Sequence, residues 1–137
     1  MKLMLLSRPN KRMKLEHIAI DVPDPEGFIA WWCENLGFRR SSPGSAFIMD
    51  DSGVSGLEIY RTGNTPSAPD YAKYDAMTLH IAFVSEDVQA DADRLIAAGA
   101  VLEKIDTSSP DFHMAILRDP WGVPVQLCKR AKCIFIK

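Results

Sequence analysis

The chain contains nearly the same short segment twice. Residues 15–20 read LEHIAI and residues 79–83 read LHIAF, so the triplet His-Ile-Ala begins at His17 and again at His80. Each copy carries one of only three histidines in the sequence. A repeated apolar strand with a repeated imidazole predicts two equivalent half-modules related by an internal twofold axis. We expect such an axis to bring the two imidazoles together, and paired imidazoles are typical of a metal site.

The first half has the pattern of a strand, a helix and three further strands. Residues 15–22 alternate between the two faces of a strand, as a half-buried strand requires. Asp24 followed by Pro25 predicts the start of a helix, and Gly37 its end. The remaining strands are predicted at residues 38–42, 46–50 and 56–62, separated by turn sequences.

The second half repeats this order after a polar linker at residues 63–75. A strand at residues 77–84 is followed by a helix that Ser85 is expected to cap and Gly99 to close. Three more strands are predicted at residues 101–107, 113–118 and 124–129. The sequence therefore predicts an α+β fold, in which two βαβββ modules form an open, cupped mixed sheet with helices on the outer face.

We expect one domain at residues 14–130, made of halves at 14–62 and 76–130, because 137 residues with 47% hydrophobic content suit a single soluble domain. Residues 1–13 are expected to be an N-terminal extension and residues 131–137 a C-terminal tail. The apolar run LMLL near the start is too short for a signal peptide or a membrane span, so we expect a cytoplasmic protein without a membrane partner. The three cysteines show no CxxC spacing, which disfavours a zinc or disulfide framework.

The formal charge of −2 is unevenly distributed along the chain. All eighteen acidic residues lie between residues 14 and 128, where only eight of the sixteen basic residues are found. The body of the protein is therefore strongly acidic, which argues against a nucleic-acid surface and makes a polyanionic ligand harder to hold.

Strand alternation sorts the polar side chains onto one face of the predicted sheets. With helices on the outer face, the residues expected to point toward them are Ile18, Ile20, Val22, Leu57, Ile59, Leu79, Ile81, Phe83, Val125 and Leu127. The opposite face then carries His17, Glu58, Tyr60, His80, Gln126 and Cys128. Four potential metal ligands thus share one concave surface, two from each half. By contrast, Trp31 and Trp32 are expected to pack in the core.

These segments resemble one superfamily of proteins. LEHIAIDVPDPEGFIAWWCENLGF, GLEIY, TLHIAF and DPWGVPVQL are similar to the opening, ligand-bearing and closing strands of the vicinal oxygen chelate superfamily, which includes glyoxalases, bleomycin resistance proteins and dioxygenases. The resemblance covers Met13 to about Arg130. It implies a divalent metal ion, nickel, zinc, manganese or iron, with ligands His17, Glu58, His80 and Gln126.

Gln126 departs from the family pattern, because the last strand usually carries a glutamate at this point. A neutral amide can still ligate a cation through its oxygen, but it adds no charge and cannot act as a base. Glu58 is therefore the only carboxylate in the set that can both ligate the metal and move a proton.

The resemblance implies a glyoxalase I-like lyase or isomerase acting on a small oxygen-chelating substrate, with Glu58 as ligand and base. Two histidines and one carboxylate also suit an extradiol-type dioxygenase. A third alternative is a non-catalytic protein of the resistance type that binds a small molecule or antibiotic, and Gln126 favours it.

Contacts to the substrate are expected from Tyr60, His113 and Arg118, with His113 outside the metal site. A chain of this size in the family is expected to form a homodimer. The sequence leaves open whether the site lies within one chain or is shared between two.

Overall fold

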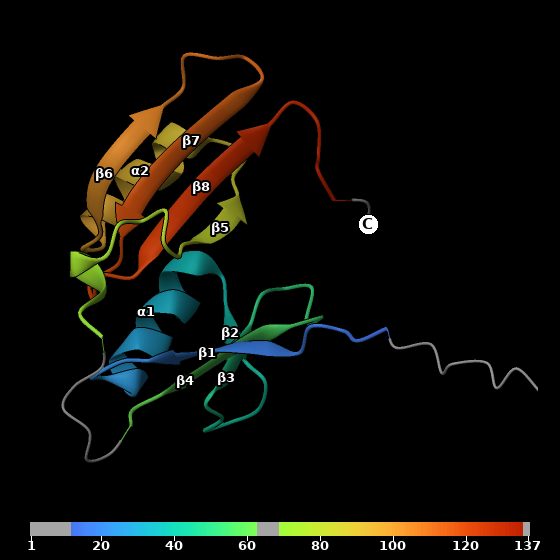
Figure 1. The fold of residues 1–137 in the computed structure, drawn as a ribbon, viewed down its shortest axis with the longest axis vertical. Helices are drawn as coiled ribbons and strands as arrows, with labels where there is room; N and C mark the ends of the chain where they lie inside the picture. Colours follow the sequence, from blue (N-terminus) through green and yellow to red (C-terminus); the bar gives the residue numbers. More distant parts are fainter. Residues whose placement is uncertain (1–11, 63–68, 136–137) are drawn as a thin grey trace, which may run out of the picture.

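The computed structural model describes residues 12–62 and 69–135, and it shows two βαβββ modules in chain order (Figure 1). The first module comprises β1 (His17–Asp21), α1 (Pro25–Leu36), β2 (Arg39–Arg40), β3 (Phe47–Met49) and β4 (Gly56–Tyr60). The second comprises β5 (Ile81–Val84), α2 (Val88–Ala97), β6 (Val101–Asp106), β7 (Phe112–Arg118) and β8 (Pro124–Arg130). A short 3-10 helix, η1 (Tyr71–Lys73), lies between them. Most of the expected N-terminal extension, part of the linker and the end of the tail lie outside the described residues.

Each module builds one four-stranded mixed sheet with the same topology. The strand orders are β1-β4-β3-β2 and β5-β8-β7-β6, and neither sheet closes on itself. The first and last strands of each module pair in parallel, whereas the other neighbours pair antiparallel. The register is equivalent as well, because Ala19 lies opposite Glu58 and Ala82 lies opposite Gln126. The predicted α+β fold with an internal repeat is confirmed.

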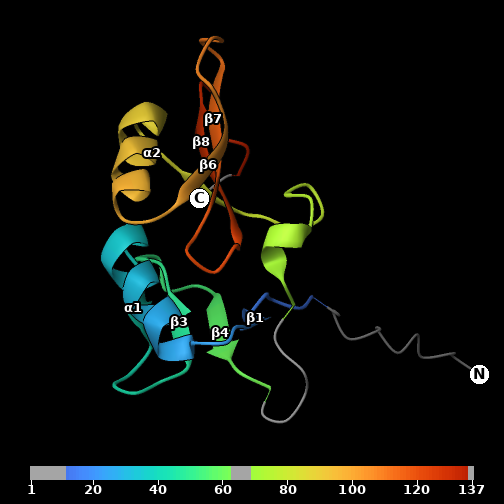
Figure 2. The ribbon, with the colours of Figure 1, turned by 90° about the vertical axis from the view of Figure 1, so that its left-hand side faces the viewer.

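The two α-helices cover the same side of the two sheets. Figure 2 shows α1 and α2 on one side of the strands and η1 on the other. Buried residues of both helices and the helix-facing strand residues form the core clusters. The sheet faces that carry Glu58 and Gln126 therefore point away from the helices.

The predicted ends of α1 are confirmed, but the predicted cap of α2 is wrong. In α1 the Asp24 carboxylate accepts a hydrogen bond from the Gly27 amide at 3.1 Å, and the helix ends at Gly37 with φ 72°. In α2 the cap is Asp87, two residues after Ser85. Ser85 still donates its backbone N–H to the Cys128 carbonyl at 2.8 Å, so the chain there continues the sheet and has not yet turned into the helix.

Strand β5 is shorter than predicted, because a turn replaces its first residues. The amide of Met77 donates to the Asp75 carboxylate at 2.8 Å, and Thr78 closes a backbone turn onto the Asp75 carbonyl at 2.9 Å. Leu79 is 55% exposed, so its predicted place in the core is wrong. Ile18 is also 46% exposed, and the core contributed by β1 begins at Ile20.

Helix α1 joins the two modules into one unit. Trp32 is fully buried and stacks on Phe28 with ring centroids 4.9 Å apart. The core cluster around these rings includes Val123 and Val125 from the second module. Trp31 contacts both core clusters and donates its indole N–H to the Ala98 carbonyl at 2.8 Å. The predicted core role of both tryptophans is confirmed.

A buried carboxylate fixes the turn between β7 and β8 against α1. Asp119 is 3% exposed and accepts the Trp32 indole N–H at 2.9 Å and the backbone amides of Trp121 and Val123 at 2.9 Å each. Burial disfavours the charged carboxylate and raises the pKa of Asp119 to about 6, although these hydrogen bonds act in the opposite direction. Gly122 completes the turn with φ 85°, and an added Cβ there would lie 2.8 Å from the backbone nitrogen of Ala72.

This raised pKa predicts how stability depends on pH. Because the folded protein holds the Asp119 proton more tightly than the unfolded chain, the stability from this group is present below about pH 4 and is lost as the pH rises through about 6. The free energy of unfolding of the wild type, relative to Asp119→Asn, should therefore fall by about 2–3 kcal/mol between pH 4 and pH 6.5. Urea unfolding at several pH values measures this difference. A difference that stays constant over the range would contradict the prediction.

Candidate functional site

The first module places His17 and Glu58 together on the open face of its sheet. His17 begins β1, and the register that sets Ala19 opposite Glu58 puts both side chains on the same face. The imidazole Nε2 lies 3.4 Å from the Glu58 carboxylate, and both side chains are about one-third exposed, at 31% and 34%. The Phe47 ring meets the imidazole edge to face at a centroid distance of 5.1 Å. Two of the four predicted ligands are therefore neighbours, and both are accessible from solvent.

The other ring nitrogen of His17 is held by a residue that strand periodicity does not predict. Nδ1 lies 2.9 Å from the carboxylate of Glu16. Alternation along a strand sets adjacent residues on opposite faces, and it therefore gives no reason to expect this contact. Glu16 precedes the first residue of β1, where the alternation does not yet apply.

The second imidazole is oriented in a comparable way. His80 directly precedes β5, and its Nδ1 lies 2.9 Å from the backbone carbonyl of Ala76. A carbonyl oxygen only accepts hydrogen bonds, so the proton of the neutral ring is on Nδ1 and the lone pair is on Nε2. Gln126 is half-buried on β8, on the open face beside Ala82 and at the position equivalent to Glu58.

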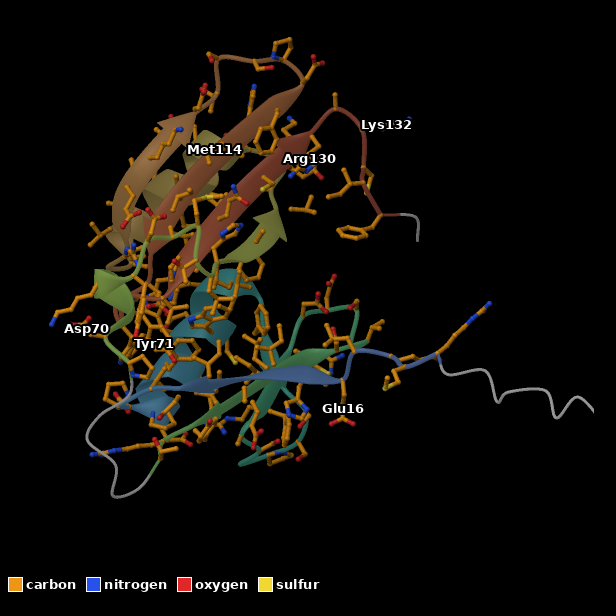
Figure 3. The ribbon with its side chains drawn as sticks, viewed as in Figure 1. Glu16, Asp70, Tyr71, Met114, Arg130 and Lys132 are labelled. Carbon is orange, nitrogen blue, oxygen red and sulfur yellow. The ribbon has the colours of Figure 1, made fainter. Side chains whose placement is uncertain are left out.

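Within one chain, the four predicted ligands are not gathered into one cluster. His17 lines a hollow of about 290 Å³ with Phe47 and Met49, whereas His80 lines a separate cavity of about 240 Å³ with Tyr71. Figure 3 shows Glu16 and Tyr71 at opposite ends of β1. Across residues 12–62 and 69–135, no group of three or more His, Cys, Asp or Glu side chains is placed to hold a metal ion.

Two of the three predicted substrate contacts lie on different faces. Tyr60 is 37% exposed at the end of β4, on the same face as Glu58. His113 lies on β7 opposite Lys129, and the pleat places it on the face of Ala115 and Leu117, which pack in the core with α2. It is therefore on the face opposite to Gln126.

Arg118, the third predicted contact, is nearly buried and bonds to four protein groups. Its guanidinium pairs with the Glu103 carboxylate and donates to the carbonyls of Tyr71 at 2.8 Å, Tyr74 at 2.6 Å and Gly122 at 3.2 Å. Only the planar fork of an arginine presents donors in enough directions for this set. Arg118 thereby holds the segment around η1 against the second module.

Comparison with known proteins agrees with the paired βαβββ architecture. Residues 14–127 match the family model of the Glyoxalase/Bleomycin resistance protein/Dioxygenase superfamily, and the chain therefore belongs to this superfamily. No curated protein matched the chain.

Several solved structures share the fold at low sequence identity. A glyoxalase family protein from Bacillus cereus is 17% identical with a TM-score of 0.68, and the match covers 93% of this chain and 99% of that one. The protein SMU.1112c is 26% identical with a TM-score of 0.62, over 87% of this chain and 100% of the other. TnmS3, an antibiotic binding protein from Streptomyces sp. CB03234, is 20% identical with a TM-score of 0.64, over 88% and 98%. No helix in the described part of the chain is long and apolar enough to cross a membrane.

The role of Arg118 predicts a large effect of a conservative change. Arg118→Lys keeps the charge but cannot reach Glu103 and three carbonyls at once, so the free energy of unfolding should fall by about 2 kcal/mol. Amide hydrogen exchange in residues 71–78 should also become faster. Arg130→Lys is the matched control, because Arg130 is exposed on β8 and should change stability by less than about 0.5 kcal/mol. Equal losses in the two variants would contradict the role assigned to Arg118.

Proposed function

We propose that the protein is a divalent-metal-dependent enzyme of the glyoxalase I type, a lyase or isomerase that acts on a small oxygen-chelating substrate. The metal ligands are His17, Glu58, His80 and Gln126, and Glu58 also serves as the base. The proposal goes beyond membership of the superfamily, because it names a reaction type and a metal site.

The observation that carries the proposal is the orientation of the two imidazoles. In each imidazole, Nδ1 lies 2.9 Å from an oxygen atom, which belongs to the Glu16 carboxylate for His17 and to the Ala76 carbonyl for His80. Histidines that ligate metals typically donate their second ring N–H to such an oxygen, which fixes the tautomer and leaves the other nitrogen for the ion. The Nε2 of His17 also lies 3.4 Å from a Glu58 oxygen, a separation that suits two ligands of one cation.

The donor set fits a divalent ion of borderline character. Two imidazoles, one carboxylate and one amide oxygen suit Ni(II), Zn(II), Mn(II) or Fe(II), and they leave positions open for substrate oxygens. When bound, such an ion acts as a Lewis acid that stabilises negative charge on a chelating substrate oxygen. Gln126 supplies an oxygen without charge.

The separation of the two half-sites supports a homodimer with shared sites. His17 and Glu58 of one protomer then lie across from His80 and Gln126 of the partner subunit. Neither α1 nor α2 covers the ligand-bearing face of its sheet, and a second copy offers the matching half to each (Figure 2). Two equivalent sites form for each dimer.

Proton transfer in this site falls to Glu58. Its carboxylate takes a proton from a carbon beside the chelating oxygen and returns it to the neighbouring carbon, which is a one-base isomerisation. The 34% exposure of the side chain leaves a path for substrate. Gln126 cannot act as a second base on the opposite face.

A second candidate function is a small-molecule binding protein without catalysis. The replacement of a family carboxylate by Gln126 favours it, and so does the likeness to TnmS3, which is an antibiotic binding protein. Such a protein needs no metal, so metal content separates the two candidates.

The leading proposal predicts metal in protein that is purified without chelator. The wild type should hold close to one divalent ion per chain, measured by inductively coupled plasma mass spectrometry. His80→Ala removes one of two imidazole ligands and should lower the content at least tenfold. His113→Ala is the matched control and should retain the metal, because His113 lies on the other face of its sheet. Wild-type protein with no more metal than His80→Ala would rule out the metal-dependent enzyme.

Sharing of the site predicts complementation between two inactive variants. In a mixed dimer of His17→Ala and His80→Ala chains, one site loses both imidazoles and the other keeps all four ligands. Coexpressed and doubly tagged dimers should therefore bind about one ion per dimer, whereas each variant alone should bind almost none. A mixed dimer that binds no more metal than the single variants would contradict a shared site.

A further inference from the structure

The cavity beside His80 lies where the two modules of one chain meet. It measures about 240 Å³, and its walls come from β1, the start of β5, the start of β8 and the segment that connects the modules. The lining is formed mainly by aliphatic and ring side chains, among them Ile20, Tyr71, Leu79 and Val123. None of the described lining residues carries a carboxylate, an ammonium or a guanidinium group. A charged ligand there would lose its hydration without gaining a counter-ion.

Both modules hold the connecting wall of this cavity in place. The Tyr71 hydroxyl donates to the Asp21 carbonyl at the end of β1, at 2.8 Å. From the second module, Arg118 donates to the carbonyls of Tyr71 and Tyr74 at 2.8 and 2.6 Å. Figure 3 shows Tyr71 between the end of β1 and the strands of the second module. A wall fixed from two sides makes the cavity preformed, which lowers the ordering cost of binding.

His80 gives this largely apolar space a hydrogen-bond acceptor. Its Nδ1 is occupied by the Ala76 carbonyl at 2.9 Å, so Nε2 is the nitrogen that accepts a hydrogen bond. A neutral ligand with a hydroxyl donor satisfies this nitrogen, while its hydrocarbon part contacts the remaining walls. An apolar cavity of about 150 Å³ is known to hold benzene, so the larger space here suits two fused rings.

We propose that the cavity between the modules binds a small, neutral aromatic alcohol of up to two fused rings, with its hydroxyl donating to Nε2 of His80. This binding needs only one chain and no metal ion. It rests on the second candidate function, a small-molecule binding protein without catalysis, and it gives that candidate a site and a ligand class. The experiment uses metal-free protein because the proposed ion would occupy the same nitrogen. Metal content tests the one proposal and ligand titration the other, so each can fail without the other.

The probe is 2-naphthol, titrated into metal-free full-length protein and followed by calorimetry and by ¹H–¹⁵N spectra. The wild type should bind one molecule per chain saturably, with shifts concentrated at residues 19–20 and 71–81. Ala19→Phe fills the cavity and should weaken binding at least tenfold. Ala82→Phe is the matched control, because Ala82 has the same register position in the second module, is likewise exposed and does not line the cavity.

A second comparison tests the hydrogen bond to His80. The wild type should prefer 2-naphthol over 2-methoxynaphthalene by at least fivefold, since the ether has no donor. His80→Leu should bind both compounds about equally. The proposal is overturned if the wild type shows no saturable binding, if Ala82→Phe weakens binding as much as Ala19→Phe, or if His80→Leu keeps the wild-type preference.

Discussion

The packing of α1 across the module boundary is the contact on which the rest of the structure depends. Trp32 is buried between the modules, and its indole N–H reaches the carboxylate of Asp119 at 2.9 Å. That carboxylate also holds the turn that leads into β8, the strand that carries Gln126. The contact between Trp32 and Asp119 therefore helps to set the position of the second sheet relative to the first, together with Trp31, which packs on both core clusters.

Most of the fold could be predicted from the sequence because local signals and strand periodicity agree. Asp24, Pro25 and Gly37 mark the ends of α1, and the repeated His-Ile-Ala segment indicates the duplication by residue type alone. The errors occur where turn chemistry competes with an apolar run. Residues 77–79 alternate like a strand, but Asp75 draws them into a turn and shortens β5. Ser85 is a good helix cap in isolation, yet its backbone belongs to the sheet.

The candidate site could be predicted only in halves. Strand periodicity is enough to place His17 with Glu58, because both lie within one module and one register. The relation between His17 and His80 depends on how the modules pack, and no periodic pattern encodes that. Contacts made by backbone carbonyls, such as that of Ala76 with His80, cannot be predicted from residue type, because every residue has a backbone carbonyl. Arg118 was expected at the substrate, but the carbonyls that surround it come from a segment whose path the sequence does not specify.

The connecting segment makes the two halves of the chain unequal. Duplication supplies each module with the same strands, the same register and a small residue at the same place, Ala19 or Ala82. A chain with two modules has one connection between them, however, and the cavity beside His80 uses its described part as a wall. Because this segment has no counterpart in the duplicated modules, a substitution in it has to fit only one environment. Such a segment can change the wall of the cavity, and with it the binding preference, without a change in the duplicated sheets.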